Sequence, residues 1–232
     1  MNKVFKQDQA QQCEAWAQLG AVKRSIILTE ASRKLADISP NGEQAQHLFN
    51  HLLSQAEKLE QVMRLEGATG ESNDLYLAPR GKAMILATEA ANPIAFLGTL
   101  VAALLTGNEV FLRYPSHQQL CEEAMAVLNQ SGVYAGVMSI TNDSELVTLL
   151  NISRLAVIGA VGTPQELLQI GKDLSETEGI LTQLVAVTDV EGCSEMFQPD
   201  YLERFCTERV KTVNTTAIGG NASLIELGMG YF

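Results

Sequence analysis

Apolar residues recur every three or four positions through the first quarter of the chain. One set runs over residues 16–38 and a second over residues 43–64, with a Pro- and Gly-containing turn sequence at 39–42 between them. This period is typical of amphipathic helices, and proline with glycine marks a turn. The pattern predicts a helical hairpin in residues 1–66, with its second helix over residues 43–64.

From residue 84 the pattern changes to short apolar runs separated by longer helical stretches. We expect strands at 84–87, 110–112, 137–140, 155–158 and 184–187, and helices at 94–105, 117–130, 144–150 and 164–174. Strands that alternate with helices through short turns indicate an open parallel sheet. The fold class predicted for the chain is therefore α/β, with a Rossmann-like, mostly parallel sheet.

Residues suited to helix ends lie at the expected boundaries. Asn92 precedes Pro93, and a capping side chain followed by proline suits the start of a helix. Gly107 suits the left-handed residue that ends one. Ser116, with Gln119 three positions later, has the sequence of a capping box. These residues predict the bounds of the helices after the first two strands.

The C-terminal part of the chain has the pattern of strands. Residues 209–216 and 223–227 are predicted to be extended, with a turn at 217–221. Two lone strands cannot bury themselves, so we expect a β-flap that projects from the domain. Residues 67–74 are small and polar and are predicted to be a linker. The expected units are a helical hairpin (1–66), a Rossmann-like α/β domain (67–203) and a flap with a tail (204–232).

Charge and cysteine content exclude several classes of protein. A net charge of −11 over 232 residues disfavours nucleic acid, because it repels the phosphate backbone. The chain begins without the apolar core of a signal peptide, and no run approaches the length of a membrane span, so we expect a cytoplasmic protein without membrane association. The four cysteines form no CxxC pair, and His47 and His51 have no third ligand beside them, so no metal site is predicted.

Two groups of motifs resemble known families. The motifs ANP, TGN and RYP within residues 81–115 resemble the cofactor domain of the aldehyde dehydrogenase superfamily. The sequences GATGESNDLYLAP and RFCTERVKTVNTTAIGGNASLIELG resemble more closely the C-terminal domain of long, trifunctional proline utilization A flavoproteins, over about residues 65–228. That domain has the aldehyde dehydrogenase fold but lacks the catalytic half. The resemblance implies the same fold here, and it places the family's oxyanion-binding asparagine at Asn92.

An aldehyde dehydrogenase needs a nucleophilic thiolate and a general base. Residues 188–208, between the last predicted strand and the flap, contain nothing similar to the family's Gly-Gln-x-Cys loop. Cys193 is the candidate that remains, with an inert loop thiol as the alternative. Cys206 is expected to pack in the strand that enters the flap. Glu178 is the carboxylate nearest to the family's general-base position, but it lies off the pattern, so no complete catalytic centre is predicted.

The sequence leaves cofactor binding open. Gly159 and Gly162 are predicted to form a turn between a strand and a helix, where backbone N–H groups can hold a pyrophosphate. The helix itself is expected to begin with a capping box of Thr163 and Glu166. The resemblance implies that Arg113 and Ser116 stand where NAD-dependent members have a lysine and a ribose-binding glutamate. Loss of that carboxylate weakens the case for NAD, the cofactor that the family suggests.

Several hypotheses on function follow. In the first, the resemblance implies a catalytically incomplete domain that docks on the proline dehydrogenase/semialdehyde dehydrogenase enzyme of proline catabolism. In the second, the chain is an NAD-dependent 1-pyrroline-5-carboxylate (glutamate-γ-semialdehyde) dehydrogenase. A third is a nucleotide-sensing module that uses the turn at Gly159. An open strand edge in the flap also predicts a homodimer. The residues expected to form the docking ribbon are Val213, Asn214, Thr215, Thr216, Gly219, Gly220 and Asn221.

Overall fold

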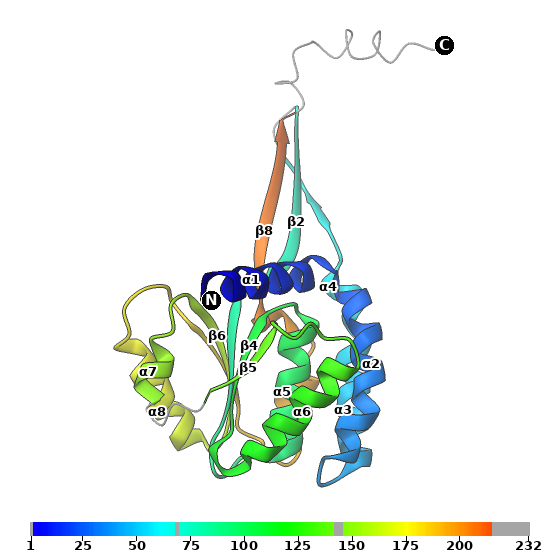
Figure 1. The fold of residues 1–232 in the computed structure, drawn as a ribbon. Helices are drawn as coiled ribbons and strands as arrows, with labels where there is room; N and C mark the ends of the chain where they lie inside the picture. Colours follow the sequence, from blue (N-terminus) through cyan, green and yellow to red (C-terminus); the bar gives the residue numbers. More distant parts are fainter. Residues whose placement is uncertain (1, 68–69, 142–145, 215–232) are drawn as a thin grey trace.

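The computed structural model describes residues 2–67, 70–141 and 146–214. In these residues a five-stranded parallel sheet forms the centre of the body, and a three-stranded antiparallel sheet projects from it as the flap (Figure 1). The parallel sheet contains β3 (Lys82–Ala87), β4 (Glu109–Arg113), β5 (Met138–Ile140), β6 (Leu155–Val161) and β7 (Gln183–Val187). The flap contains β1 (Met63–Leu65), β2 (Glu71–Pro79) and β8 (Cys206–Asn214). The predicted α/β class and the parallel sheet are confirmed.

The strand order of the parallel sheet is β5-β4-β3-β6-β7. The first strand of this sheet along the chain, β3, lies at its centre. Strands β4 and β5 follow on one side of β3, and the chain then crosses to the other side to form β6 and β7. The order therefore reverses between β3 and β6. In doubly wound sheets, ligands bind at the carboxyl ends of the strands at such a switch point.

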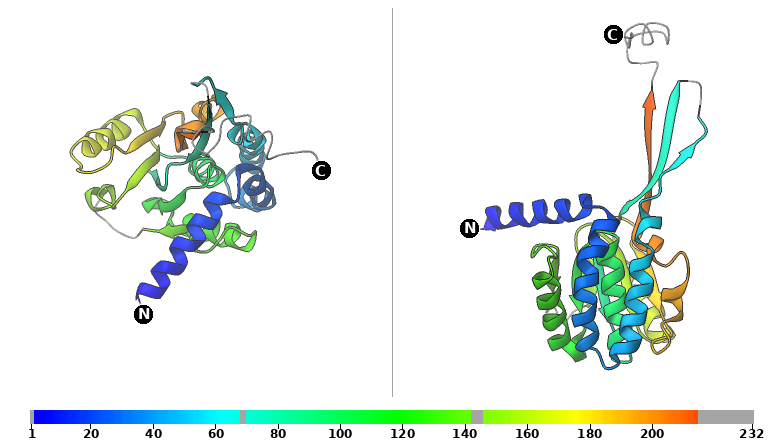
Figure 2. Two further views of the ribbon diagram at one scale, coloured as in Figure 1. Left: turned by 90° about the horizontal axis from the view of Figure 1, so that it is seen from above. Right: turned by 90° about the vertical axis from the view of Figure 1, so that its right-hand side faces the viewer.

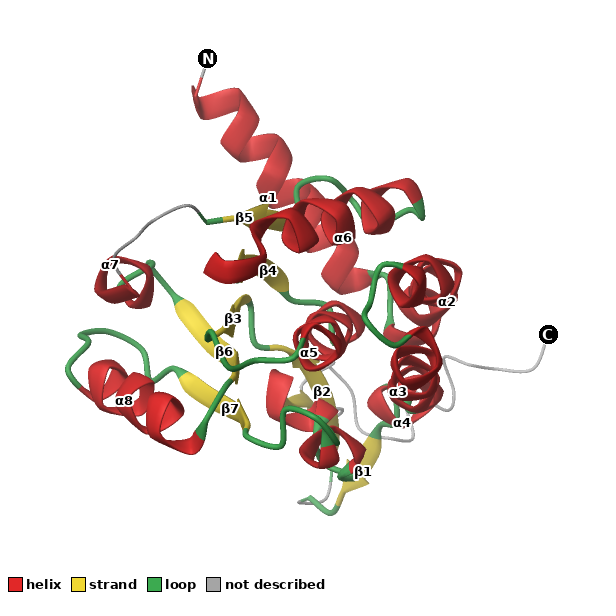
Figure 3. Ribbon diagram, turned by 90° about the horizontal axis from the view of Figure 1, so that it is seen from below, coloured by secondary structure: helices red, strands yellow, loops and turns green. Residues whose placement is uncertain are grey.

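Helices cover both faces of the sheet (Figure 3). One face carries α5 (Pro93–Leu105) and α6 (Gln118–Gln130), with α2 (Ala21–Asp37) and α3 (Gly42–Ser54) packed outside α5. The other face carries α7 (Leu146–Leu150) and α8 (Pro164–Ser175). The remaining helices are α1 (Asn2–Gln18) and α4 (Ala56–Leu59), with short 3-10 turns at Pro115–His117, Ser194–Phe197 and Leu202–Phe205. Two apolar cores result, one on each face.

Helix α5 is the centre of the larger core. Every residue from Ile94 to Leu105 is buried, because the helix lies between the sheet and the outer helices. Pro93 is its first residue, and Gly107, with φ of +88°, follows its end. Full burial of each large aliphatic side chain contributes about 1.5–3 kcal/mol. The apolar run therefore specifies this helix, as the sequence predicts.

Two buried side chains fix the amino-terminal helices to the end of α5. The indole N–H of Trp16 donates to the Leu104 carbonyl at 3.1 Å. The Arg24 guanidinium donates to the carbonyls of Leu105 at 2.8 Å and Ala17 at 2.9 Å. These carbonyls lie in the last turns of α5 and α1, where helix carbonyls lack intrahelical partners. Burial lowers the pKa of Arg24 to about 10, which still leaves it charged at neutral pH.

The helical part differs from its prediction at two points. Gly20, with φ of +87°, separates α1 from α2, so the apolar period over residues 16–38 spans two helices. The helix predicted over residues 43–64 is wrong beyond Leu59, because Met63–Leu65 form β1. Val62 and Met63 continue the apolar period, yet they are 61% and 62% exposed at the base of the flap. These two apolar residues therefore do not belong to the buried face of a helix.

The linker predicted over residues 67–74 is wrong from Glu71 onward. Strand β2 begins there and pairs with β8 along its whole length, from Glu71 opposite Asn214 to Pro79 opposite Cys206. The first half of β2 is polar because the ribbon stands away from the body (Figure 2). Strand β8 confirms the extended segment that enters the flap, whereas the strand predicted at 223–227 lies outside the described residues.

Two local predictions on turns are also wrong. Gly159 lies inside β6, opposite Ile85, and a Cβ there would collide with Thr99 Cγ2 of α5. Glycine is needed at this position for close packing of helix on sheet, and the turn starts only at Gly162. The capping box at Ser116 does not form, because α6 begins later, at Gln118, and Ser116 Oγ lies 3.1 Å from His117 Nδ1.

Candidate functional site at the carboxyl edge of the sheet

The carboxyl ends of the strands bring several of the predicted residues to one edge. Asn92 follows β3, Arg113 is the last residue of β4 with Ser116 close behind it, and Gly162 follows β6. This edge includes the switch point of the sheet and is therefore the candidate site. Gly159 does not belong to it, since it lies within β6.

Asn92 acts as a helix cap at this edge. Its Oδ1 accepts a hydrogen bond from the Ile94 N–H at 2.8 Å. The Tyr114 hydroxyl donates to the carbonyl of the preceding Ala91 at 2.5 Å. Burial raises the pKa of Tyr114 to about 12, so its hydroxyl keeps its proton. The Asn92 turn is thus fixed to the end of β4.

Three donors converge on one carboxylate oxygen at the start of α8. Glu166 Oε2 accepts from the Thr88 hydroxyl at 2.9 Å, the Thr163 N–H at 2.9 Å and the Thr163 hydroxyl at 2.7 Å. The expected capping box of Thr163 and Glu166 is confirmed. These bonds, first of all the one from the Thr163 hydroxyl, hold the pKa of Glu166 below its ordinary value. The carboxylate is therefore ionised at neutral pH.

The residues at this edge do not fit the pyrophosphate of NAD. Such a group needs backbone N–H donors at the helix start. The Gly162 N–H donates instead to the Val187 carbonyl at 3.2 Å, and Pro164 has no N–H. A Cβ at Gly162 would collide with Thr88 Oγ1, so the two strand ends lie in close contact. The donors predicted to bind a phosphate are therefore engaged or missing.

Cys193 follows β7 and is buried in the larger core, on the face of the sheet that carries α5. The Cys193 side chain is 1% exposed, and its backbone is left-handed with φ of +53°. Burial raises the pKa of its thiol to about 11, and the carboxylates of Asp189 and Glu195 act in the same direction. Cys193 is therefore a neutral thiol at physiological pH.

Of the other three cysteines, Cys121 and Cys206 are buried and Cys13 is half-buried. Burial is the main cause that raises the pKa of Cys13 and Cys121 to about 11 and that of Cys206 to about 12. Cys206 is 5% exposed at the start of β8, as its predicted packing role requires. Because the thiolate is the nucleophilic form, none of the chain's four cysteines is activated in this structure.

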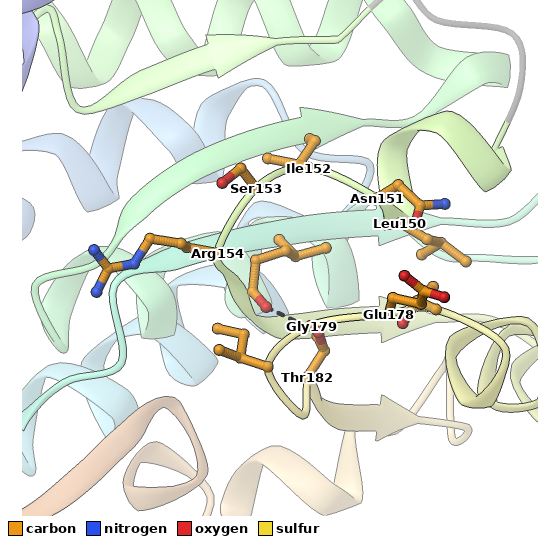
Figure 4. A pocket seen from close by; sticks show the side chains of 11 residues that line it. Leu150, Asn151, Ile152, Ser153, Arg154, Glu178, Gly179 and Thr182 are labelled. Carbon is orange, nitrogen blue, oxygen red and sulfur yellow. Dashed lines mark hydrogen bonds between the residues drawn. The ribbon is translucent and has the colours of Figure 1, made fainter.

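A cavity of about 240 Å³ lies at the opposite edge, where β6 and β7 begin (Figure 4). Arg154 and Glu178 lie on opposite sides of it. The Thr182 hydroxyl donates to the Leu155 carbonyl at 2.8 Å across its floor. Glu178 thus lies at the amino edge of the sheet, remote from Asn92, which is at the carboxyl edge.

The flap has two chemically different faces. Residues directly opposite one another in paired strands share a face. One row across the three strands contains Met63, Leu75 and Val210, and is apolar. The adjacent row, on the other face, contains Arg64, Asp74 and Lys211. Arg209, opposite Tyr76, adds a third cation to that second face, which we call the cationic face of the flap.

Strand β8 forms the edge of the described flap (Figure 2). Its residues from Glu208 to Asn214 are exposed, and the exposed fractions of Val210 and Val213 are 52% and 37%. Val213 and Asn214 of the predicted docking ribbon lie at the end of this strand. The other predicted residues of the ribbon, Thr215, Thr216, Gly219, Gly220 and Asn221, lie outside the described residues.

Two histidines of α3 contact one aromatic ring. His47 and His51 lie against the ring of Phe197, with ring centroids 5.7 Å and 4.8 Å away. Within residues 2–67, 70–141 and 146–214, no group of three His, Cys, Asp or Glu side chains is arranged to hold a metal ion. No helix in the same ranges combines the length and the apolar character needed to cross a bilayer.

No protein-family model matches the chain. A 1-pyrroline-5-carboxylate dehydrogenase from Anoxybacillus flavithermus is 26% identical over 116 residues, which are 50% of this chain and 22% of that protein. A proline utilization A structure from Bradyrhizobium japonicum has a TM-score of 0.66 and 22% identity over 76% of this chain and 21% of its own. An NAD-dependent benzaldehyde dehydrogenase from Corynebacterium glutamicum has a TM-score of 0.61 and 16% identity over 77% of this chain and 43% of its own.

The structural matches cover about three quarters of this chain and the sequence match covers half of it, but each covers less than half of the other protein. The chain spans 22% of the length of the curated relative and 21% of the proline utilization A chain. This partial coverage fits a domain-sized part of those enzymes. The chain therefore has the fold of the aldehyde dehydrogenase superfamily and is structurally similar to part of the proline utilization A chains.

Proposed function

We propose that the chain is a catalytically incomplete aldehyde dehydrogenase-like domain that serves proline catabolism as an accessory domain. It docks through its flap on the enzyme that carries proline dehydrogenase or semialdehyde dehydrogenase activity. The observation that carries this proposal is the flap, whose β8 edge is exposed from Glu208 to Asn214. The link to proline rests on the similarity to proline utilization A and 1-pyrroline-5-carboxylate dehydrogenase.

The state of the thiols supports an accessory role. An aldehyde-oxidising centre needs a thiolate within reach of an oxyanion donor. Cys193 is 1% exposed, and burial raises the pKa of its thiol to about 11, so the thiol keeps its proton at neutral pH. Asn92 itself caps α5. The chain alone therefore offers binding rather than aldehyde oxidation.

The cationic face supports a partner with acidic groups. It carries Arg64, Arg209 and Lys211 against one acid, Asp74, in a chain whose net charge is −11. A strand added beside β8 with carboxylates at alternate positions would bring them next to Arg209 and Lys211, since alternate residues share a face. Such complementarity fixes register and orientation. The partner surface we propose is an acidic strand.

The proposal is tested by coupled turnover. NADH formation is measured first from glutamate-γ-semialdehyde with the chain alone, and then from proline with the chain added to the proline-oxidising enzyme of the same cell. We expect no NADH from the chain alone and a faster coupled flux in the mixture. Arg209→Glu with Lys211→Glu should abolish the gain. The matched control is Arg33→Glu with Lys34→Glu, the same charge change on the exposed surface of α2.

The homodimer is a proposal on the same edge. If two copies of β8 paired antiparallel about Val210, Arg209 would lie opposite Lys211 of the other copy, which is unfavourable. Pairing about Thr212 places Lys211 opposite Val213 instead. We therefore expect the second register. By light scattering, Val213→Lys should give a monomer and Val213→Glu should retain the dimer. A wild-type monomer, or identical masses for both variants, would contradict this register.

The curated relative favours one other candidate function, an NAD-dependent 1-pyrroline-5-carboxylate dehydrogenase. This activity requires that one thiol become ionised and approach the aldehyde. Turnover by the chain alone in the assay above would establish it and remove the accessory proposal. If the chain alone forms no NADH and the coupled flux from proline increases in the mixture, the result supports the accessory role.

A further inference from the structure

We infer that Glu166 occupies an anion site at the switch point of the sheet as an internal ligand, and that it thereby closes this edge to the pyrophosphate of a dinucleotide. The site concerns the body of the molecule and does not depend on docking through the flap. It is formed by Thr88, which follows β3, and by Thr163, which follows β6.

The donors of this site come from two different strand ends. The hydroxyls of Thr88 and Thr163 and the Thr163 N–H all bind the same oxygen of Glu166, at 2.7–2.9 Å. Three donors that converge on one oxygen, at the start of a helix, form the arrangement that binds one oxygen of a phosphate. The positive end of the α8 dipole adds to the preference for an anion.

The carboxylate excludes a second anion from this place. A phosphate oxygen would need the space that Glu166 Oε2 fills, and the negative charge of the carboxylate would repel it at short range. Two further backbone donors of this edge are engaged, since the Gly162 N–H binds the Val187 carbonyl and the Ile94 N–H binds Asn92. Glu166 is thus the residue that decides the anion specificity of this edge.

The inference predicts that removal of the carboxylate exposes the site. Glu166→Ala leaves the Thr88 and Thr163 donors in place and removes their acceptor. We expect inorganic pyrophosphate to raise the Tm of this variant in a saturable manner and to give binding heat in calorimetry. Wild-type protein should show neither effect with millimolar pyrophosphate or NAD. Glu166→Gln, whose carbonyl oxygen can still accept the three bonds, should remain closed.

Matched variants keep the test specific. Glu176→Ala removes a glutamate at the other end of α8 and should bind no pyrophosphate. Glu166→Ser serves in place of the alanine variant if that variant fails to fold. Thr88→Val added to Glu166→Ala removes one donor and should weaken pyrophosphate binding several-fold. Saturable binding of pyrophosphate or NAD by the wild-type protein would overturn the inference. The absence of pyrophosphate binding by folded Glu166→Ala and Glu166→Ser proteins would also overturn it.

Discussion

The carboxyl edge of the sheet and the flap differ in where their polar groups find partners. At the edge, Thr88, Thr163 and Glu166 bind one another, and Tyr114 binds the turn before Asn92. In the flap, Arg209 and Lys211 stand exposed on an edge strand. The place where this fold class usually binds ligands is thus closed by the chain itself, and the place that projects outward is open. This difference supports the proposal that the flap docks on a partner.

The largest effect is expected where the body is most tightly packed. Gly159→Val would drive a side chain of β6 into Thr99 of α5 and should lower the free energy of unfolding by about 3 kcal/mol. Urea unfolding measures the change. Ser72→Val, a β-branched substitution in the flap, serves as the control and should stay within about 0.5 kcal/mol of wild type. Equal losses in both would remove the contrast between body and flap.

A smaller effect is expected from the bond that holds the Asn92 turn. Tyr114→Phe removes the donor to the Ala91 carbonyl and should cost about 1 kcal/mol, since a buried acceptor loses its partner. Tyr76→Phe in the flap is the matched control. If Tyr114→Phe unfolds at the same urea concentration as wild type, the edge is not held by this bond.

Acid should weaken the closed edge. The pKa of Glu166 lies below its ordinary value of 4.5 in the folded protein, first because of the bond from the Thr163 hydroxyl. A carboxyl group whose folded pKa is depressed contributes stability above its unfolded pKa, and this contribution is lost as pH falls through the folded pKa. Wild-type stability should therefore fall below about pH 4.5, and Glu166→Gln should show a shallower fall. An identical pH profile for both would contradict the assignment.

The smallest effect on stability is expected in the flap itself. Arg209→Glu with Lys211→Glu changes exposed charges and should alter the free energy of unfolding by no more than about 0.5 kcal/mol. The same variant should lose the gain in coupled flux. A large loss of stability would show that these cations support the fold rather than a partner.

The sequence predicts the body better than the flap because the signals of the body are local. The apolar run of α5, the Asn92 cap and the capping box of Thr163 each lie within a few residues, and all are present. The pairing of β2 with β8 joins Glu71 to Asn214, and nothing in the polar sequence of β2 indicates that partner. A ribbon exposed on both faces does not show the usual alternation of buried and exposed positions.

The candidate site was predicted in part for the same reason. Glu166 and Thr163 are three positions apart, so their bond follows from a known sequence pattern. Thr88 comes from another strand, and only the order of the sheet brings it to Glu166. The turn expected at Gly159 failed because a glycine required for packing inside a strand has the same sequence signature as a glycine in a turn.

The most direct test of the account is sedimentation velocity of the chain mixed with the proline-oxidising enzyme of the same cell. The account predicts that wild-type chain and the Arg33→Glu/Lys34→Glu control move with the enzyme, whereas Arg209→Glu/Lys211→Glu sediments alone. Equal association of all three proteins, or association of none, would contradict docking through the cationic face of the flap.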